Sequence, residues 1–183
     1  MALLDSPICN FGWQAPEFAL NDANGRTFSL SQSIGSSGLL VMFICNHCPY
    51  VKAIAQRLAD DTKMLMDAGV GVVAVMSNSW RHYPEDSPSN MLKFAHKYGF
   101  DFPYLVDENQ SVAKSYGAVC TPDFFGFNRN GELQYRGRLD NIGIGGDPSN
   151  RQTELLDAMA MIAETGEGPK EQVPSMGCSI KWM

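Results

Sequence analysis

Two continuous apolar runs, with an amphipathic stretch between them, dominate the hydrophobic pattern of the first half of the chain. Leu39–Ile44 and Val70–Met76 have the length of strands buried at the centre of a sheet. The stretch between them carries apolar residues on one helical face, and Gly69 ends this predicted helix. The residues of that face are Val51, Ile54, Ala55, Leu58, Leu65 and Met66. The pattern predicts a strand–helix–strand unit of an α/β fold.

Capping signals mark three later helices. The polar stretch that starts at Ser77 predicts a loop. Ser87 and Pro88 then supply an N-cap and a first-turn proline for a helix that runs to about Tyr98. Two further helices open with a capping-box pattern: Asp107 with Gln110, for a helix that ends before Gly117, and Ser149 with Gln152, for the last helix.

Turn signals mark two hairpins. Asn24-Gly25 joins two extended segments into an N-terminal hairpin, and residues 128–131 form the turn of a second one. The paired segments are Ala15–Leu20 with Arg26–Leu30, and Asp123–Phe127 with Glu132–Tyr135. With the short extended segment Tyr104–Val106, they predict a central mixed β-sheet flanked by helices. Residues 166–183 show no clear period.

Composition places the chain among ordinary globular domains. Its 183 residues suffice for one domain with a sizeable core, and 44% of them are hydrophobic. The net charge of −6, with Lys and Arg scattered, argues against a nucleic-acid partner. No stretch approaches the roughly 18–20 apolar residues of a membrane span, and the first ten residues carry no secretory signal. We therefore expect a cytoplasmic protein without a membrane partner.

The most informative chemical feature is a pair of cysteines, Cys45 and Cys48, directly after the first buried run. Pro49 is tolerated only in the first turn of a helix, so we expect the helix to begin near Asn46 with both thiols at its N-terminal end. Free backbone N–H groups there favour the thiolate. The chain holds five cysteines, too few for a secreted disulfide scaffold. This spacing in a cytosolic protein predicts a redox-active pair.

The order of elements, with this pair after the first buried strand and Thr121-Pro122 before the second hairpin, resembles the thioredoxin-like superfamily. Within it, the chain is most similar to the peroxiredoxin-related redoxins of the AhpC/TSA group. The matching motifs are Ala15-Pro16-Glu17-Phe18, Cys48-Pro49, residues 102–107, Tyr116-Gly117, and Phe127-Asn128 with Gly131. A subgroup with two cysteines at the peroxidatic position also shares the terminal motif Gly177–Trp182.

This resemblance implies a thioredoxin-like fold with an N-terminal hairpin extension. It covers most of residues 14–165, which we take as the redoxin domain. Residues 1–13 are then an N-terminal extension, and residues 166–183 a C-terminal tail that carries Cys178. No cofactor is expected.

Two departures from peroxiredoxins favour disulfide exchange over peroxide reduction. Peroxiredoxins hold a threonine three residues before the peroxidatic cysteine, and Cys45 takes its place if Cys48 is aligned with that cysteine. An arginine that activates peroxide is replaced by Pro122. The resemblance therefore implies a thiol–disulfide oxidoreductase acting on protein or small-molecule disulfides, with a thioredoxin or glutathione system as electron donor. Two alternatives stay open: a weak thiol peroxidase, and a copper- or zinc-binding module that uses Cys45, His47 and Cys48.

Each residue of the pair receives a role. We expect Cys45, at the more exposed N-terminal position, to be the attacking thiol, and Cys48 to resolve the mixed disulfide. Pro49 modulates the site through the helix start. His47, if protonated, would stabilise the Cys45 thiolate and make the pair more oxidising; the alternative is a solvated side chain with no effect.

The resemblance also implies that Thr121-Pro122 is a cis dipeptide that faces the cysteine pair and binds a substrate chain. Cys120 precedes this dipeptide and is either a third redox thiol or a buried structural cysteine. Cys178 could be brought to the pair by a mobile tail and act as a relay thiol, or it could belong to a tail packed for structural reasons. Cys9 is expected to be incidental.

Four further positions are weaker candidates. The loop Trp80–Tyr83 is aromatic and polar, and is either part of a substrate surface or a solvated loop. Arg138 and Asp140 either neighbour the site or form an ordinary surface pair. His96 is expected on a helix surface.

Overall fold

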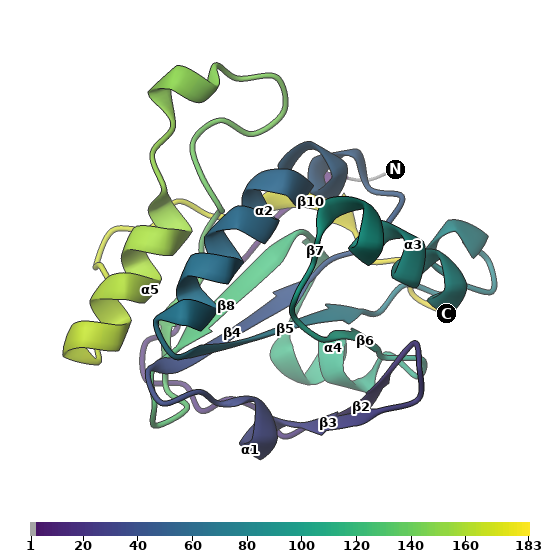
Figure 1. Ribbon diagram of the computed structural model, residues 1–183, viewed down its shortest axis with the longest axis horizontal. Coiled ribbons are helices and arrows are strands. Elements are labelled where there is room, and N and C mark those ends of the chain that lie inside the picture. The colour runs from purple at the N-terminus through teal and green to yellow at the C-terminus, as the bar shows by residue number, and fades with distance from the viewer. Residues whose placement is uncertain (1–2) are drawn as a thin grey trace.

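The computed structural model describes residues 3–183, which are organised around a seven-stranded mixed sheet (Figure 1). In spatial order the strands are β3 (Thr27–Ser29), β2 (Ala19–Asp22), β6 (Tyr104–Val106), β5 (Val70–Met76), β4 (Gly38–Phe43), β8 (Asp123–Phe127) and β9 (Leu133–Tyr135). The central strands β4, β5 and β6 are parallel, whereas the outer pairs are antiparallel. The predicted mixed sheet is confirmed.

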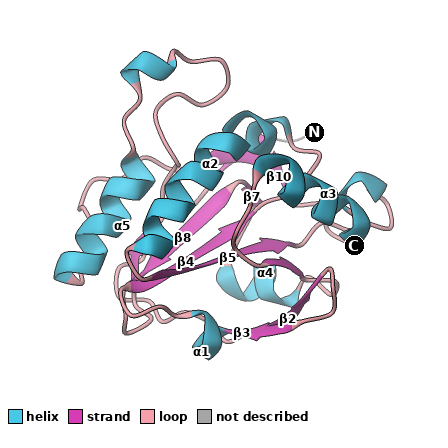
Figure 2. Ribbon diagram, viewed as in Figure 1, coloured by secondary structure: helices cyan, strands magenta, loops and turns pink. Residues whose placement is uncertain are grey.

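Helices cover both faces of this sheet (Figures 1 and 2). One face packs against α2 (Pro49–Asp67), α3 (Pro88–Tyr98) and α5 (Glu154–Thr165), and the other against α1 (Leu30–Ser33) and α4 (Ser111–Tyr116). Successive residues of β4 point to opposite faces, so Leu40 and Met42 belong to the first core and Leu39 and Val41 to the second. Every position of β4 is buried, which explains its uninterrupted apolar sequence.

A second, three-stranded sheet joins the two ends of the chain. Its strands are β1 (Leu3–Asp5), β10 (Met176–Ser179) and β7 (Cys120–Thr121), with β10 in the middle and both pairings antiparallel. In Figure 1, β10 lies next to the N-terminal end of α2. The segment predicted as an aperiodic tail therefore contains a strand.

Helix α2 begins later than predicted. Pro49 occupies its first position and Cys48 is the N-cap, so the helix does not begin near Asn46. Proline favours this first position, because the N–H that it lacks would have no partner within the helix. The consequence for the site is that only the second cysteine lies at the helix terminus.

Two other helix starts also differ from the capping-box prediction. Asp107 does cap α4, but its carboxylate accepts hydrogen bonds from the N–H groups of Val112 and Ala113, 3.2 and 2.9 Å away, while Gln110 is the N-cap in the left-handed conformation. Ser149 lies in a 3₁₀ turn, Pro148–Asn150, rather than at the start of α5. Within residues 3–183, no helix has both the length and the apolar composition needed to cross a bilayer.

Candidate active site

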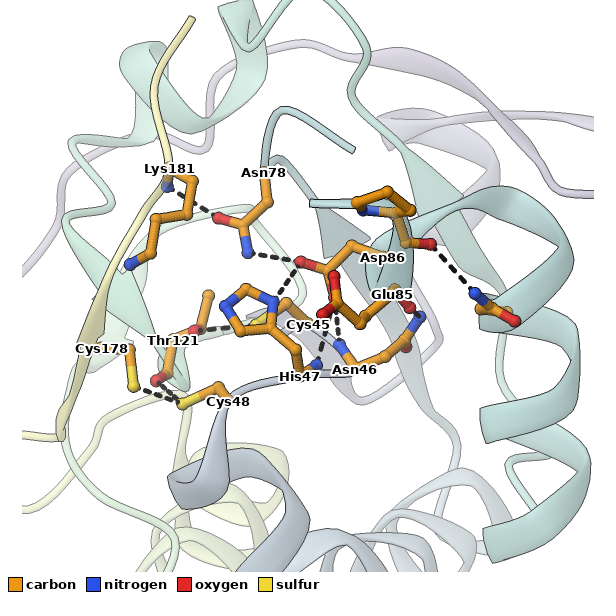
Figure 3. Close-up of polar contacts among 12 residues, drawn as sticks. Cys45, Asn46, His47, Cys48, Asn78, Glu85, Asp86, Thr121, Cys178 and Lys181 are labelled. Carbon is orange, nitrogen blue, oxygen red and sulfur yellow. Dashed lines mark hydrogen bonds and ion pairs between the residues drawn. The ribbon is translucent and has the colours of Figure 1, made fainter. Parts of the chain in front are cut away.

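Three thiols meet where β4 runs into α2 (Figure 3). The Cys48 Sγ atom lies 3.0 Å from the Cys178 Sγ atom and 3.1 Å from the carbonyl oxygen of Thr121. The Cys45 Sγ atom lies 3.3 Å from the Thr121 hydroxyl. All five cysteines are free, and these three are 0%, 0% and 3% exposed. The structure thus brings together the predicted pair, the predicted dipeptide and the tail cysteine.

Cys48 has the surroundings of a thiolate. The Cys45 thiol donates a hydrogen bond to its sulfur, and this contribution outweighs burial, which acts in the opposite direction. The Cys178 thiol and the Val51 N–H group at the start of α2 also donate to it. Together these contacts lower the pKa of Cys48 to about 5. When protonated, Cys48 donates its hydrogen to the Thr121 carbonyl instead.

Cys45 and Cys178 behave in the opposite way. Burial raises the pKa of Cys45, and the neighbouring charge of Cys48 raises it further. Burial likewise raises the pKa of Cys178 to about 12, with a second contribution from its hydrogen bond to Cys48. Neither lies at the helix N-terminus. The geometry therefore favours Cys48, rather than the predicted Cys45, as the thiolate of the site, and Cys45 is no more exposed than its partner.

A buried carboxylate holds the loop between the two cysteines. Asp86 accepts hydrogen bonds from the N–H groups of Asn46 and His47, at 2.7 and 3.2 Å, and its other oxygen lies 2.6 Å from His47 Nδ1. Burial alone would raise the pKa of Asp86, but the hydrogen bonds from His47 and Asn78 hold it below its ordinary value. Asp86 is completely buried and comes from a 3₁₀ turn, Pro84–Asp86.

His47 is tied down rather than freely solvated. Its hydrogen bond to Asp86 raises its pKa, partly offset by burial. Its ring is stacked on that of Tyr83, with centroids 5.5 Å apart and planes 9° from parallel. Its Nε2 atom is buried and has no hydrogen-bond partner among residues 3–183.

The metal-binding alternative involves a different set of atoms from those predicted. Donor atoms of Cys45, His47 and Asp86 lie within 4.8 Å of one another, and Cys48 is not among them. Each of these residues already takes part in an internal hydrogen bond, and Asp86 accepts several. These hydrogen bonds involve the Cys45 sulfur, His47 Nδ1 and both Asp86 oxygens, and we assign no metal to the set.

Asn78 connects this loop to the C-terminal segment. Its side-chain N–H donates to Asp86 at 2.8 Å, and its side-chain oxygen accepts the Lys181 N–H at 2.8 Å. The Lys181 carbonyl in turn accepts hydrogen bonds from the Ser79 N–H and the Gln110 side chain, both at 2.8 Å. The segment after Cys178 is therefore held in place by the loops on both sides of the site.

Asp86 and Asn78 are the site residues that sequence reasoning missed. A usable signal was present, because β4 and β5 are parallel and the loops that follow them must meet at one edge of the sheet. The polar loop after β5 therefore had to lie near the cysteine pair. Which of its residues would contact the pair depended on the path of that loop.

The peptide bond between Thr121 and Pro122 is cis, as the resemblance implied. Strand β7 ends at Thr121, and β10 pairs with it so that Cys178 lies opposite Thr121 and Ser179 opposite Cys120. The edge of the dipeptide that was expected to bind a substrate chain is thus occupied by a strand of the protein itself.

The other predicted cysteines lie outside this cluster. Cys120 is completely buried, and its thiol donates a weak hydrogen bond to the Pro122 carbonyl at 3.6 Å. Burial raises the pKa of Cys120, and the charge of Asp123 adds to this effect. Cys9 is half-buried, and burial raises its pKa to about 11. Both have the surroundings of unreactive thiols.

Arg138 and Asp140 do not pair with each other. Arg138 binds Glu154 at 2.6 Å, and Asp140 binds Arg57 and Arg151 at 2.7 and 2.9 Å. Within the loop Trp80–Tyr83, Tyr83 reaches the site through its stacking on His47. His96 is exposed near the end of α3, as expected.

A cavity of about 520 Å³ lies beside the dipeptide, and Arg138 and Asp140 are among its lining residues. Its walls are mainly apolar, and they include Pro122, Tyr50 and Ile144. None of the three clustered thiols lines it. The cavity therefore lies beside the dipeptide and does not contain the sulfur atoms of the three thiols.

With this geometry in view, comparison with known proteins decides the family. Residues 11–136 match the AhpC/TSA family. The chain belongs to this family. Two solved structures share its architecture: a protein from Chlorobium tepidum, with a TM-score of 0.61 at 22% identity, and a thioredoxin domain from Bacteroides vulgatus, with a TM-score of 0.58 at 19% identity. The fold of this AhpC/TSA protein is therefore thioredoxin-like.

Similar proteins include members with two different activities in their names. Peroxiredoxin Q from Populus jackii chloroplasts is 30% identical over 117 residues, which are 64% of this chain and 50% of that protein. The thiol-disulfide oxidoreductase ResA of Halalkalibacterium halodurans is 26% identical over 129 residues, 70% of this chain and 69% of ResA. The chain thus spans between half and about two thirds of the length of these curated relatives.

A crystal structure of an uncharacterized conserved protein from Geobacillus kaustophilus is similar over the whole chain. Its TM-score is 0.93 at 41% identity, and the match covers 100% of this AhpC/TSA protein and 97% of the other. The similarity includes both ends of the chain, where β1 and β10 pair.

Proposed function

We propose that this protein is a thiol–disulfide oxidoreductase in which Cys48 is the attacking thiolate. The observation that carries the proposal is the position of Cys48 at the N-cap of α2, where hydrogen bonds from the Cys45 and Cys178 thiols and a helix N–H lower its pKa to about 5. Exchange with a substrate disulfide requires a thiolate that is formed at neutral pH and a second thiol beside it that resolves the mixed disulfide.

The reaction proceeds by two exchanges. The Cys48 thiolate attacks one sulfur of a substrate disulfide, forms a mixed disulfide and releases the other sulfur as a thiolate. The Cys45 thiol then gives up its proton, attacks the Cys48 sulfur and releases the second substrate thiol. Two electrons pass from the cysteine pair to the substrate, and an external dithiol or two monothiols restore the reduced pair and are themselves oxidised to a disulfide.

Access is a requirement of this mechanism. Cys48 is completely buried, so a substrate disulfide reaches its sulfur only after local opening of the structure. The segments over the site are β10 and the loop that carries Asp86, and both are held by hydrogen bonds rather than by covalent links.

The relatives support a thiol-based reaction, since their names are thiol-disulfide oxidoreductase and peroxiredoxin. Peroxide reduction is the second candidate, favoured by the family match and by the low pKa of Cys48. Against it, Cys45 and Pro122 stand where peroxiredoxins are expected to hold the threonine and the arginine that act on peroxide. We place the protein in the cytoplasm, with a thioredoxin or glutathione system as electron donor.

The test compares disulfide substrates with peroxide in two NADPH-linked reducing systems. Purified protein is supplied with thioredoxin, thioredoxin reductase and NADPH, or with glutathione, glutathione reductase and NADPH. NADPH consumption is followed with hydroxyethyl disulfide, insulin or hydrogen peroxide. We expect a disulfide to be turned over faster than peroxide by about tenfold or more, and Cys48→Ser to abolish turnover. Faster turnover of hydrogen peroxide than of either disulfide would contradict this proposal and support the thiol peroxidase instead.

A further inference from the structure

Strand β10 occupies the position in which an extended substrate would pair with the dipeptide. Its register sets Cys178 opposite Thr121, the residue before Pro122. An extended substrate that pairs with an open strand edge gains main-chain hydrogen bonds, and its side chains are then placed by the register. Here β10 makes those hydrogen bonds, and the side chain placed next to Cys48 is a thiol.

The sequence of β10 is adapted to this close approach. A Cβ atom at Gly177 would lie 2.0 Å from the Thr121 carbonyl oxygen, so only glycine allows the strand to pack this tightly against the dipeptide. Just before the strand, the Ser175 hydroxyl donates to the Pro122 carbonyl at 2.7 Å. Gly177 in the strand and Ser175 just before it thus both contact the dipeptide directly.

Both flanks of β10 are anchored as well. Strand β1 pairs with its other edge, with Leu3 opposite Cys178. Beyond the strand, the Ile180 N–H donates to the Val119 carbonyl at 3.1 Å, and the Lys181 N–H to Asn78. The position of the Cys178 thiol is therefore defined by the fold, which fits the packed tail of the two alternatives that the sequence left open.

We propose that β10 is an internal substrate of the site, whose Cys178 exchanges with the oxidised cysteine pair to form a reversible Cys48–Cys178 disulfide. The proposal rests on the exchange activity proposed above and deepens it. The contact of the two sulfurs at 3.0 Å is close to the roughly 2.05 Å of a disulfide bond, so little movement separates the two states.

The step conserves atoms and electrons. In the oxidised protein, the Cys178 thiol loses its proton and its sulfur attacks Cys48 in the Cys45–Cys48 disulfide. The Cys48–Cys178 bond forms, the Cys45–Cys48 bond breaks, and the Cys45 sulfur leaves and takes up the proton. No external oxidant or reductant is needed, because one disulfide replaces another. Burial raises the pKa of both Cys45 and Cys178, so whichever of the two is not in the disulfide is a protonated thiol at neutral pH.

Disulfide mapping tests the proposal directly. The reduced full-length protein is treated with one equivalent of 4,4′-dithiodipyridine, quenched in acid, digested without reduction and analysed by mass spectrometry. We expect a peptide that links Cys48 with Cys178. A second measurement adds one equivalent of the same probe to Cys45→Ser, in a background in which Cys9 and Cys120 are serine. Formation of the internal disulfide releases two thiopyridones per protein, whereas a mixed disulfide with the probe releases one.

Variants in β10 separate strand pairing from simple proximity. Gly177→Ala places a methyl group against the Thr121 carbonyl, and we expect the ratio of Cys48–Cys178 to Cys45–Cys48 disulfide to fall by about tenfold or more. Met176→Ala is the matched control, because Met176 is in the same strand but its side chain is exposed, and its ratio should stay within about twofold of wild type.

The outcomes distinguish this proposal from the one on which it rests. Wild-type protein that turns over hydroxyethyl disulfide, yields only a Cys45–Cys48 peptide and releases one thiopyridone as Cys45→Ser would overturn the internal exchange and leave the oxidoreductase standing. Wild-type protein that turns over no disulfide would contradict the oxidoreductase itself. A Cys48–Cys178 peptide with two thiopyridones released establishes the internal exchange.

Discussion

The N-terminal end of α2 and strand β7 each bury a cysteine beside the same dipeptide, yet the two thiols have opposite properties. Cys48 and Cys120 are both completely buried. Hydrogen bonds from two thiols and from a helix N–H lower the pKa of Cys48 to about 5, whereas Cys120 has only a weak acceptor for its own proton and burial raises its pKa. Burial alone therefore makes a cysteine inert, and donors directed at the sulfur make it a nucleophile.

Replacing each cysteine in turn is the strongest test of this contrast. Cys48→Ser removes the attacking sulfur, so we expect disulfide turnover to fall by about a thousandfold or more. Cys120→Ser should leave turnover within about twofold of wild type, since its thiol donates to the Pro122 carbonyl and is not among the groups that donate hydrogen bonds to Cys48. Steady-state rates with hydroxyethyl disulfide provide the measurement. Comparable losses in the two variants would remove the distinction.

Thiolate titration sharpens the same contrast. The absorbance of thiolate at 240 nm should rise in one step with a midpoint near pH 5 in the reduced protein, from Cys48. The step should persist in Cys120→Ser and vanish in Cys48→Ser. A first step at about pH 8.5, the ordinary cysteine value, would mean that the hydrogen bonds to Cys48 do not stabilise its thiolate.

The loop carboxylate supports only the α2 region. Asp86→Asn removes the charge that accepts hydrogen bonds from two backbone N–H groups and His47, and we expect the free energy of unfolding to fall by about 2 kcal/mol. Glu85→Gln is the matched control, because Glu85 is adjacent and exposed, and should change it by less than about 0.5 kcal/mol. Urea denaturation at neutral pH measures both. Equal changes would show that Asp86 has no special part in the loop.

The smallest expected effect is a pH dependence from His47. Because Asp86 raises its pKa in the folded protein, the His47–Asp86 pair contributes stability that is fully present below about pH 6.5 and is lost as the pH rises through the raised value. Below the ordinary aspartate range, protonation of Asp86 removes it again. The difference in urea midpoint between wild type and His47→Gln should therefore be larger at pH 6 than at pH 9. A constant difference would show that the pair is not ionic.

Periodicity predicted the sheet well and the small second sheet not at all. Val70–Met76 was predicted at its observed bounds because a buried central strand is almost entirely apolar, and Asp123–Phe127 because a turn signal follows it. Strands β7 and β10 have two and four residues and are defined by partners far away in the sequence. A local pattern carries no such information.

The members of the site were predicted, whereas the structure favours a different order of roles for the two cysteines. Cys45, Cys48, Cys178 and Thr121 do meet, whereas the attacking role was given to Cys45 because the helix was expected to begin near Asn46. The preference of proline for the first helical position places the start at Pro49 instead. Asp86 could not be named, because its contacts depend on how a loop about forty residues away folds back over the pair.

The central place of β10 in its sheet has a consequence for association. Because β10 pairs on both sides, its departure would expose the edges of β1 and β7 together. Exposed strand edges are templates for strands of other chains. A partner that displaces β10 therefore meets two ready-made hydrogen-bonding edges, and without such a partner the same edges would promote self-association. The closed form, with β10 in place between β1 and β7, is the one protected from it.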